Sequence, residues 1–464
     1  MNRIVLFLFT VMVGTCILTS CSDNDDVDLA GVEVTNAELK AMLKQKGFTF
    51  NEEDKLVQDD KVKNTTTLDL SGCNLTDVSG LGVFPNLTEV NLSDNKFSFS
   101  FDLSMLPASV NSVDLTGNEI YEYPGLVKVI TEENGDETVT VLRELKKLYL
   151  PEGAKYNCDD LVSFYTTNKT VIDNGSMDMK MANNSGSLIN YNTLREVPDE
   201  VLREFLLENF PSMFDGDHIN IARRMVKANE ANANLVLTKE LGNENIEGVQ
   251  YIVMNNSYKG GQIVLMANNS SELKYLKIKP ELYKLKLSKI NTGYMNLSNA
   301  ANLCFVNIDN NDHVEQLDVS ASTLFGQRST EYEFAIMDNP SEIRINNCPR
   351  FKTIIYPQKA KYLCTLSLYN LPLLEEVNLS QYRGMNTLEL GGLNGLKKVT
   401  YFTPDGYYGF ISPDKKGVMF GISPEIYEFS ETKTFLDEYH ENFVQLSFPR
   451  STGVSTYKWA NDYK

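Results

Sequence analysis

A short apolar motif repeats along the first half of this chain, and that repetition limits the folds open to it. The stretches LDLSGCNL from Leu68, LTEVNLSDNKF from Leu87 and VNSVDLTGNEI from Val110 share one alternation of apolar and polar residues. Their central residues Leu68, Val90 and Val113 lie 22 and 23 residues apart. Because a unit of this size cannot bury its apolar face alone, we expect successive units to stack around one elongated core.

A fourth copy of the motif, LKKLYL from Leu145, is centred on Leu148, 35 residues after Val113. The extra length is an insertion, KVITEENGDETVTVL, in which Asn134 and Gly135 separate two β-rich runs. An Asn-Gly pair in that setting predicts a hairpin turn. The L-x-L core of each copy predicts a short strand whose alternate side chains point inward.

The copies fit the pattern L-x-x-L-x-L-x-x-N/C-x-L, with Cys73, Asn95 and Asn118 at the N/C position. We expect that position to be buried where the chain bends, so that an asparagine amide bonds loop backbone groups. The chain resembles leucine-rich repeat proteins, and its arrangement is similar to internalin-type domains. That resemblance implies a helical cap over the first repeat, and the residues from Asn36 to Gly47 form a candidate helix with its C-terminal glycine.

A second array of short runs extends from Leu303 to Tyr401 at half the spacing. Its central residues, separated by steps of 11 or 12, include Ile343, Ile354, Leu366, Val377, Leu388 and Val399. Half of 22 indicates two strands per coil, one on each face. We therefore predict an α/β repeat solenoid of the leucine-rich repeat class, with two tandem arrays of short parallel strands and helical caps.

Composition breaks indicate where these domains begin and end. We predict a signal peptide at 1–20, an acidic tether at 21–34, a first repeat domain at 35–180, a linker at 181–192, a second repeat domain with a helical cap at 193–402, and an aromatic-rich C-terminal cap at 403–464. The linker is the polar stretch MANNSGSLINYN. The cap helix of the second domain follows Asp199, with Val201, Phe205 and Leu206 on one face.

The C-terminal segment breaks the repeat period and is rich in aromatic residues, including Trp459. Its stretch SETKTFLDEYHENFVQL predicts a helix with Phe435, Tyr439 and Phe443 four residues apart. Two interpretations are open. The segment seals the last coil, or its aromatic side chains form a platform for a ligand.

The start of the chain predicts where in the cell the protein is located. Arg3 precedes an apolar run from Ile4 to Leu18, which is shorter than the roughly 20 residues that cross a bilayer as a helix. A basic start, a short apolar core and a small-residue exit are typical of a secretory signal. The residues from Leu18 to Cys21 resemble the lipobox of bacterial lipoproteins, which implies cleavage before Cys21 and a lipid anchor on its thiol. Three acidic residues at 22–26 resemble the export signal of Bacteroidota surface lipoproteins, which implies an outer-membrane anchor facing the cell exterior.

Composition also excludes some functions. The net charge of −19 argues against nucleic-acid binding, because phosphates require a basic surface. The seven cysteines show no CxxC pair, and the three histidines, at 218, 313 and 440, lack metal-site spacing. The chain also lacks a P-loop and a nucleophile elbow. We expect no catalytic residue, no bound metal and no cofactor, and so a protein that is not an enzyme.

The candidate site is the solvent-facing side of the first array, because the x residues of x-L-x-L-x point outward and stack into ladders. One predicted ladder contains Asp69, Asn91, Asp114 and Tyr149, and the other contains Thr67, Glu89, Ser112 and Lys147. Leucine-rich repeat proteins commonly bind partners on this face, so the resemblance implies the same use here.

A second candidate is a local basic stripe within an acidic chain. It consists of Lys274, Lys277, Lys279, Lys284, Lys286 and Lys289, which alternate with apolar residues. The stripe either meets an acidic glycan or protein, or protects a sheet edge from aggregation.

Together these features predict a lipid-anchored surface protein that binds an unknown protein or glycan through its repeat surface, as an adhesion module does. The alternative is a non-catalytic accessory or structural lipoprotein of an outer-membrane complex.

Overall fold

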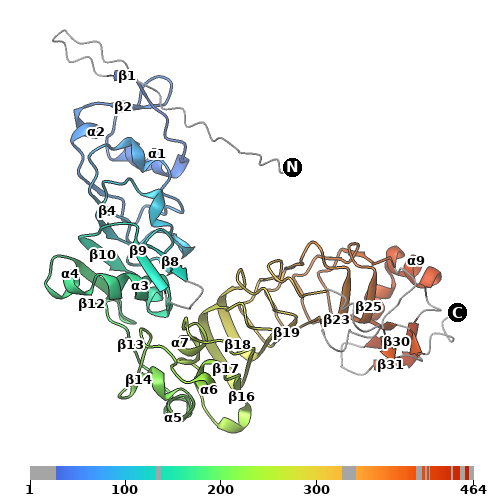
Figure 1. Ribbon diagram of the computed structural model, residues 1–464. Coiled ribbons are helices and arrows are strands. Elements are labelled where there is room, and N and C mark those ends of the chain that lie inside the picture. The colour runs from blue at the N-terminus through green and yellow to red at the C-terminus, as the bar shows by residue number, and fades with distance from the viewer. Residues whose placement is uncertain are drawn as a thin grey trace, which may run out of the picture.

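The computed structural model describes residues 28–131, 137–326, 341–403, 410–412, 415–416, 418–439, 443–449 and 455–458. The described chain forms two elongated arms that meet at an angle (Figure 1). Parallel strands dominate both arms, and the helices between them are few and short. This arrangement agrees with the predicted α/β class. The predicted signal peptide and Cys21 lie outside the described residues.

A small cap begins the first arm. It consists of β1 (Asp28–Val32), α1 (Ala37–Gln45), β2 (Leu56–Gln58) and α2 (Asp60–Asn64). The Asn36 side chain accepts a hydrogen bond from the Leu39 N–H at 2.9 Å, and Leu39 and Leu43 are buried. Gly47 ends the helix in the left-handed region, with φ of 76°. The predicted cap helix is therefore confirmed, and the end of the predicted tether forms β1, antiparallel to β2.

Six strands form the sheet of the first arm. In spatial order they are β12 (Leu188–Asn190), β11 (Asp178–Ala182), β10 (Lys147–Leu150), β6 (Ser112–Asp114), β4 (Glu89–Asn91) and β3 (Thr67–Asp69). β12 is antiparallel to β11, and the other neighbours are parallel. Leu68, Val90, Val113 and Leu148 pair in one register and are buried, as the repeat spacing predicts.

The asparagines of the N/C position lie where the chain leaves each strand. The amide of Asn95 donates to the carbonyls of Leu70, Leu92 and Ser93, and its oxygen accepts from the Leu75 N–H. Asn118 makes the corresponding contacts one repeat later. The expectation that this position satisfies buried backbone groups is confirmed for both residues.

The remaining elements of the first arm flank its sheet. They are β5 (Ser98–Ser100), β7 (Glu119–Glu122), β8 (Val127–Thr131), β9 (Glu137–Val141), α3 (Asp160–Thr167), α4 (Lys169–Asp173) and 3₁₀ helices at Leu81–Val83, Leu103–Met105 and Glu152–Tyr156. β8 and β9 pair antiparallel, so the predicted hairpin is confirmed, although its turn residues Asn134 and Gly135 lie outside the described part of the chain.

The segment predicted as a linker, 181–192, is part of the first sheet. It contributes the end of β11 and all of β12, and the Tyr191 ring is buried in the core of the first arm. Its polar composition fits an edge strand as well as a linker, because an edge strand exposes most of its side chains. Composition alone did not separate these two structures.

The second arm opens with small elements. They are β13 (Leu194–Arg195), α5 (Glu200–Asn209), a 3₁₀ helix at Pro211–Met213, β14 (Phe214–Asp215), β15 (His218–Asn220), α6 (Ala228–Ala231), a 3₁₀ helix at Lys239–Leu241 and α7 (Val249–Val253). Asp199 accepts from the Leu202 N–H at 2.9 Å and caps α5 where we predicted a helix start. The buried face is formed by Leu202 and Leu206, whereas Val201 is 43% exposed. Assigning Val201 to that face was wrong by one residue.

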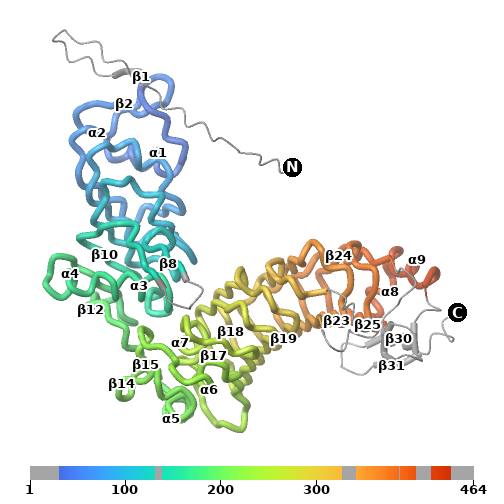
Figure 2. The backbone as a smooth tube through the Cα atoms, in the orientation of Figure 1, coloured from blue at the N-terminus to red at the C-terminus, as the bar shows by residue number. Residues whose placement is uncertain are grey.

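One long sheet extends through the second arm. Its strands are β16 (Leu235–Leu237), β17 (Gln262–Lys277), β18 (Lys284–Asn296), β19 (Phe305–Asp309), β21 (Glu342–Asn346), β23 (Tyr362–Tyr369), β25 (Gly384–Gly391), β29 (Val418–Ile422), β30 (Phe443–Pro449) and β31 (Ser455–Lys458). The first nine are parallel, and β31 is antiparallel to β30. Figure 2 shows the chain passing through successive similar turns along this arm.

Two further pairs of parallel strands lie outside the long sheet. They are β20 (Gln316–Asp318) with β22 (Thr353–Ile355), and β24 (Glu376–Asn378) with β26 (Lys398–Thr400). Ile343, Leu366 and Leu388 share one register in the long sheet, whereas Val377 pairs with Val399 in the short one. Consecutive steps of 11 residues therefore alternate between two sets of strands, as predicted.

The described part of the C-terminal segment packs on the end of the second arm. It contains β27 (Phe410–Ser412), β28 (Lys415–Lys416), α8 (Pro424–Tyr427) and α9 (Ser430–Tyr439). Phe435 is buried and stacks on Tyr401 with ring centroids 4.4 Å apart. This contact favours the sealing interpretation for α9. The predicted helix is shorter than expected, because Phe443 begins β30 instead, and Trp459 lies outside the described residues.

Candidate functional site

The two predicted ladders lie side by side on the solvent-facing side of the first sheet. Thr67, Glu89, Ser112 and Lys147 pair across β3, β4, β6 and β10, and Asp69, Asn91, Asp114 and Tyr149 pair two residues further along the same strands. All eight side chains are exposed or half-buried. We call these eight residues the polar face.

Three members of the polar face also hold the backbone of the following turn. One side-chain oxygen of Asp69, Asn91 and Asp114 accepts from the N–H two residues later, in each case at 3.0 Å. This hydrogen bond is the reason for a short polar side chain at the end of each strand. The same residues therefore have a structural role whether or not a partner binds them.

The end of the polar face at β10 carries a polar network. The Lys147 ammonium lies 3.0 Å from Glu89 and 4.7 Å from the centre of the Tyr149 ring. The Tyr149 hydroxyl donates to Asp178 at 2.6 Å, and Asp178 also pairs with Lys180 at 3.0 Å. The hydrogen bond to Asp178 raises the pKa of the Tyr149 hydroxyl.

Asp178 and Lys180 extend the two ladders by one strand, because they pair with Lys147 and Tyr149 across β10 and β11. We did not predict them as site residues. The alternation of polar and apolar residues in DMKMA is the pattern that identifies this fifth strand.

The six lysines of the predicted basic stripe do not occupy one surface. β17 and β18 pair in two blocks on either side of an irregularity, so Lys284 and Lys286 lie beside Gln262 and Val264, whereas Lys277 lies beside Asn296. Lys284 lies 4.8 Å from the Phe305 ring, Lys279 donates to Asn256 and Lys289 donates to the Asn268 carbonyl. Lys274 and Lys277 instead contact the first arm.

Ion pairs and tyrosines join the two arms. Lys277 lies 2.5 Å from Asp159, and Lys274 lies 3.3 Å from Glu152. The Tyr275 hydroxyl donates to Glu122 at 2.7 Å. Because β17 lies against the first arm here, these lysines do not protect an open sheet edge at this place.

Aromatic rings continue this junction in one series of contacts. Phe99 stacks on Tyr294 at 4.2 Å, and Tyr294 stacks on Tyr275 at 5.8 Å. Tyr275 stacks on Tyr121 at 5.0 Å with the rings nearly parallel, and Tyr121 contacts Tyr156 at 6.2 Å. Such pairs add stability beyond area burial. Tyr121 and Tyr156 belong to the same hydrophobic core as the second arm, so the junction is packed like an interior.

Burial and nearby charges shift the pKa values of two adjacent acids at the junction in opposite directions. Burial raises the pKa of the Asp160 carboxyl to about 7, and the adjacent Asp159 adds to that shift. Burial also opposes ionisation of Asp159, but Lys277 and Lys279 hold the pKa of that carboxyl below its ordinary value. The pKa values of these two adjacent carboxyls thus differ because the lysines of the second arm lie closer to Asp159 than to Asp160.

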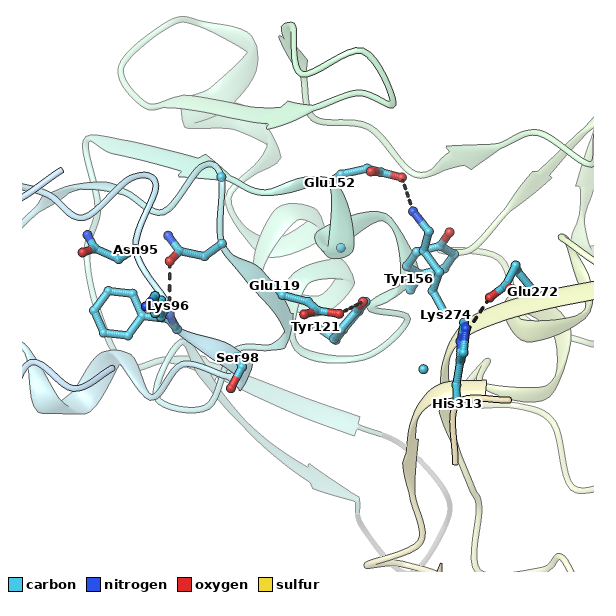
Figure 3. Close-up of a pocket in the computed structure, with 15 residues that line it drawn as sticks. Asn95, Lys96, Ser98, Glu119, Tyr121, Glu152, Tyr156, Glu272, Lys274 and His313 are labelled. Carbon is cyan, nitrogen blue, oxygen red and sulfur yellow. Dashed lines mark hydrogen bonds and ion pairs between the residues drawn. The ribbon is translucent and has the colours of Figure 1, made fainter. Parts of the chain in front are cut away.

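A cleft of about 660 Å³ lies between the arms, beside this junction. Figure 3 shows Lys96, Ser98 and Glu119 on the side of the first arm and Lys274, Glu272 and His313 on the side of the second. His313 lies 3.4 Å from Glu272, and the Tyr121 hydroxyl donates to Glu119 at 3.3 Å. We did not predict this cleft, because its walls come from segments far apart in the sequence.

Other candidate groups are dispersed. Among the residues that the structure describes, no three His, Cys, Asp or Glu side chains gather as metal ligands would. Cys158, Cys304 and Cys348 are buried free thiols and pack as small apolar residues do. No helix in the described part of the chain combines the length and apolar character that crossing a bilayer requires.

Comparison with known proteins adds no family to this description. Neither the scan against protein-family models nor the search of curated proteins finds a match to the chain.

Proposed function

We propose that this protein is a lipid-anchored binding protein of the outer cell surface, and that it holds a partner protein on the polar face of a leucine-rich repeat solenoid. One observation carries the proposal. Eight solvent-facing side chains from four strands align in two adjacent ladders, with cationic, anionic and neutral groups next to one another. A mixed surface of this kind suits a partner that carries complementary charges.

The repeat class is part of this proposal. Two features support it: a spacing of 22 or 23 residues that places Leu68, Val90 and Val113 in one register, and asparagines that bond loop backbone groups at the end of the repeat motif. The anchor rests on the lipobox-like residues before Cys21, and the outward orientation rests on the acidic residues after it.

A protein partner fits the polar face better than a glycan does. Sugars stack on bare aromatic rings, but two ammonium groups, of Lys147 and Lys180, lie 4.7 and 5.3 Å from the centre of the Tyr149 ring. Tyrosine is instead enriched at protein–protein interfaces, and polar groups form the rim of such interfaces. The chain offers no catalytic constellation on this face, so we propose binding without catalysis.

The proposal is tested by crosslinking in intact cells. A photo-reactive amino acid is placed at Thr67 or Ser112 on the polar face, and at Thr353 on β22 as a control. We expect a protein adduct from the first two positions and none from the third. In a Lys147→Glu background the yield of the adduct should fall at least about fivefold, because the substitution reverses the charge at position 147 of the polar face.

Two results would contradict the proposal. One is the same adducts from Thr353 as from the polar face. The other is an absence of protein adducts together with binding of purified chain to a glycan array through Tyr149. An adduct with an outer-membrane complex would identify the accessory lipoprotein alternative as the form that the binding function takes.

A further inference from the structure

The cleft between the arms has polar side chains on both of its walls. Lys96 and Glu119 line one wall, and Glu272, Lys274 and His313 line the other. Its volume of about 660 Å³ lies within the range of small-molecule sites, roughly 300 to 1,000 Å³. None of these residues belongs to the polar face.

Two glycines also line the cleft. They are Gly153 and Gly293, and a side chain at Gly153 would place its Cβ 2.5 Å from the Ile120 carbonyl oxygen. A Cβ at Gly293 would lie 2.9 Å from the Lys274 carbonyl oxygen. Because protein atoms already fill both Cβ positions, a larger residue at Gly153 or Gly293 would push apart the segments that form the cleft.

Each carboxylate of the cleft has a polar partner but still has hydrogen-bond acceptor positions left. Glu152 pairs with Lys274 and Lys155, Glu272 pairs with His313, and Glu119 accepts from the Tyr121 hydroxyl. A carboxylate accepts about four hydrogen bonds, so each retains acceptor positions toward the cleft. The lysine ammonium groups likewise retain donors.

The charged groups that line the cleft indicate which class of ligand it can bind. Three glutamates and two lysines do not favour a phosphate or another strongly anionic group. A ligand with many hydroxyl groups matches the cleft, because a hydroxyl can donate to a carboxylate and accept from an ammonium group. We infer that the cleft between the arms binds a short neutral oligosaccharide.

The packed junction fixes the walls relative to each other. The Tyr121 and Tyr275 rings are stacked directly beside the cleft, and the Lys274 to Glu152 ion pair crosses between the arms. A ligand therefore does not have to order the two arms before it binds, which reduces the entropic cost of binding.

The test uses the whole chain in detergent and a panel of neutral disaccharides, measured by calorimetry. We expect at least one disaccharide to bind. The double variant Glu119→Gln, Glu272→Gln keeps the shape of the cleft but weakens two acceptors, and should lower affinity at least about tenfold. The matched control Glu204→Gln, Glu208→Gln changes two exposed glutamates of α5 and should bind as the unaltered chain does.

Three outcomes would overturn the inference: no binding by any disaccharide of the panel, binding that the cleft variant does not weaken, or binding that the control weakens equally. Thermal unfolding of each variant checks that the fold is retained. Loss of saccharide binding in a Tyr149→Ala variant would move the sugar site to the polar face. Crosslinking from Thr67 and Ser112 is measured separately, so failure of this inference and failure of the proposed function give different results.

Discussion

Asparagine and glycine decide the shape of the bends in both arms. Asn95 and Asn118 bond backbone groups in the first arm, and the Asn311 amide donates to the Ile290 carbonyl in the second at 2.7 Å. After strands of both arms the chain also enters the left-handed region, with φ of 71° at Gly117 and 61° at Gly392. Glycine adopts this conformation without the steric cost that other residues meet.

Two glycines at equivalent bends provide a matched test of this requirement. A Cβ at Gly117 would lie 2.0 Å from the Asp94 Oδ1, whereas a Cβ at Gly72 would meet nothing within 4 Å, and both residues have positive φ. We expect Gly72→Ala to cost about 1 kcal/mol of unfolding free energy and Gly117→Ala about 2 kcal/mol or more. Denaturant unfolding measures both, and equal losses would show that the contact with Asp94 is unimportant.

Asp160 makes the stability of the junction depend on pH. Its pKa of about 7 lies above that of an unfolded aspartate, about 4, so the folded chain binds this proton more tightly. The stability from this group is complete below about pH 4 and is lost as the pH rises toward 7. Lys277, Glu122 and Asp159 face the same carboxyl, and they remain in the variant below.

Asp160→Asn removes that ionisation. We expect the variant to gain at least about 1 kcal/mol relative to the unaltered chain between about pH 5 and about pH 8, because only the unaltered chain must ionise a buried carboxyl. Urea unfolding at the two pH values measures the change. Asp173→Asn alters an exposed carboxyl of α4 and is the control. An identical pH response in Asp160→Asn and the unaltered chain would exclude this role.

At the scale of elements, β17 is the strand that joins the arms. Its first part lies in the long sheet beside β16, and its second part presents Lys274, Tyr275 and Lys277 to the first arm. Alternation along a strand sends successive side chains to opposite faces. Tyr275 and Lys277 are two residues apart and therefore share one face of β17, whereas Lys274 lies on the other face.

Tyr275→Ala should loosen the angle between the arms. The change removes two stacking contacts and the hydrogen bond to Glu122, with a cost of about 3 kcal/mol or more. We expect a broader distance distribution between spin labels on α4 and β22. Tyr275→Phe keeps the ring and should keep the narrow distribution. If both variants remain as narrow as the unaltered chain, other contacts fix the angle.

For the whole molecule, the proposed anchor predicts where the protein is found. Cys21→Ala should abolish incorporation of a labelled fatty acid and release the protein from the membrane fraction, because acyl chains contribute about 0.8 kcal/mol per buried CH₂. Protease added to intact cells should digest the repeat arms of the unaltered protein. Labelling that persists without Cys21 would exclude the anchor, and arms protected from protease would exclude the outward orientation.

The amino-acid sequence was sufficient to predict much of the local geometry of this protein. Spacing predicted the register of Leu68, Val90 and Val113 and the alternation of strands in the second arm. Local residue signals predicted the helix after Asn36 and the hairpin of the insertion. The polar face also followed from spacing, since residues two apart on a strand share a face. These features depend on contacts within one repeat or between adjacent repeats.

How the two arms meet became visible only in the folded structure. The Tyr275 to Glu122 hydrogen bond joins residues 153 positions apart, and no periodicity in the chain records such a contact. The contact between the arms also explains the cleft and the separation of the six lysines onto different surfaces. Side-chain packing explains why β12 is an edge strand. Repeat spacing sets the contacts between adjacent repeats. The junction instead depends on how the surfaces of the two folded arms fit together.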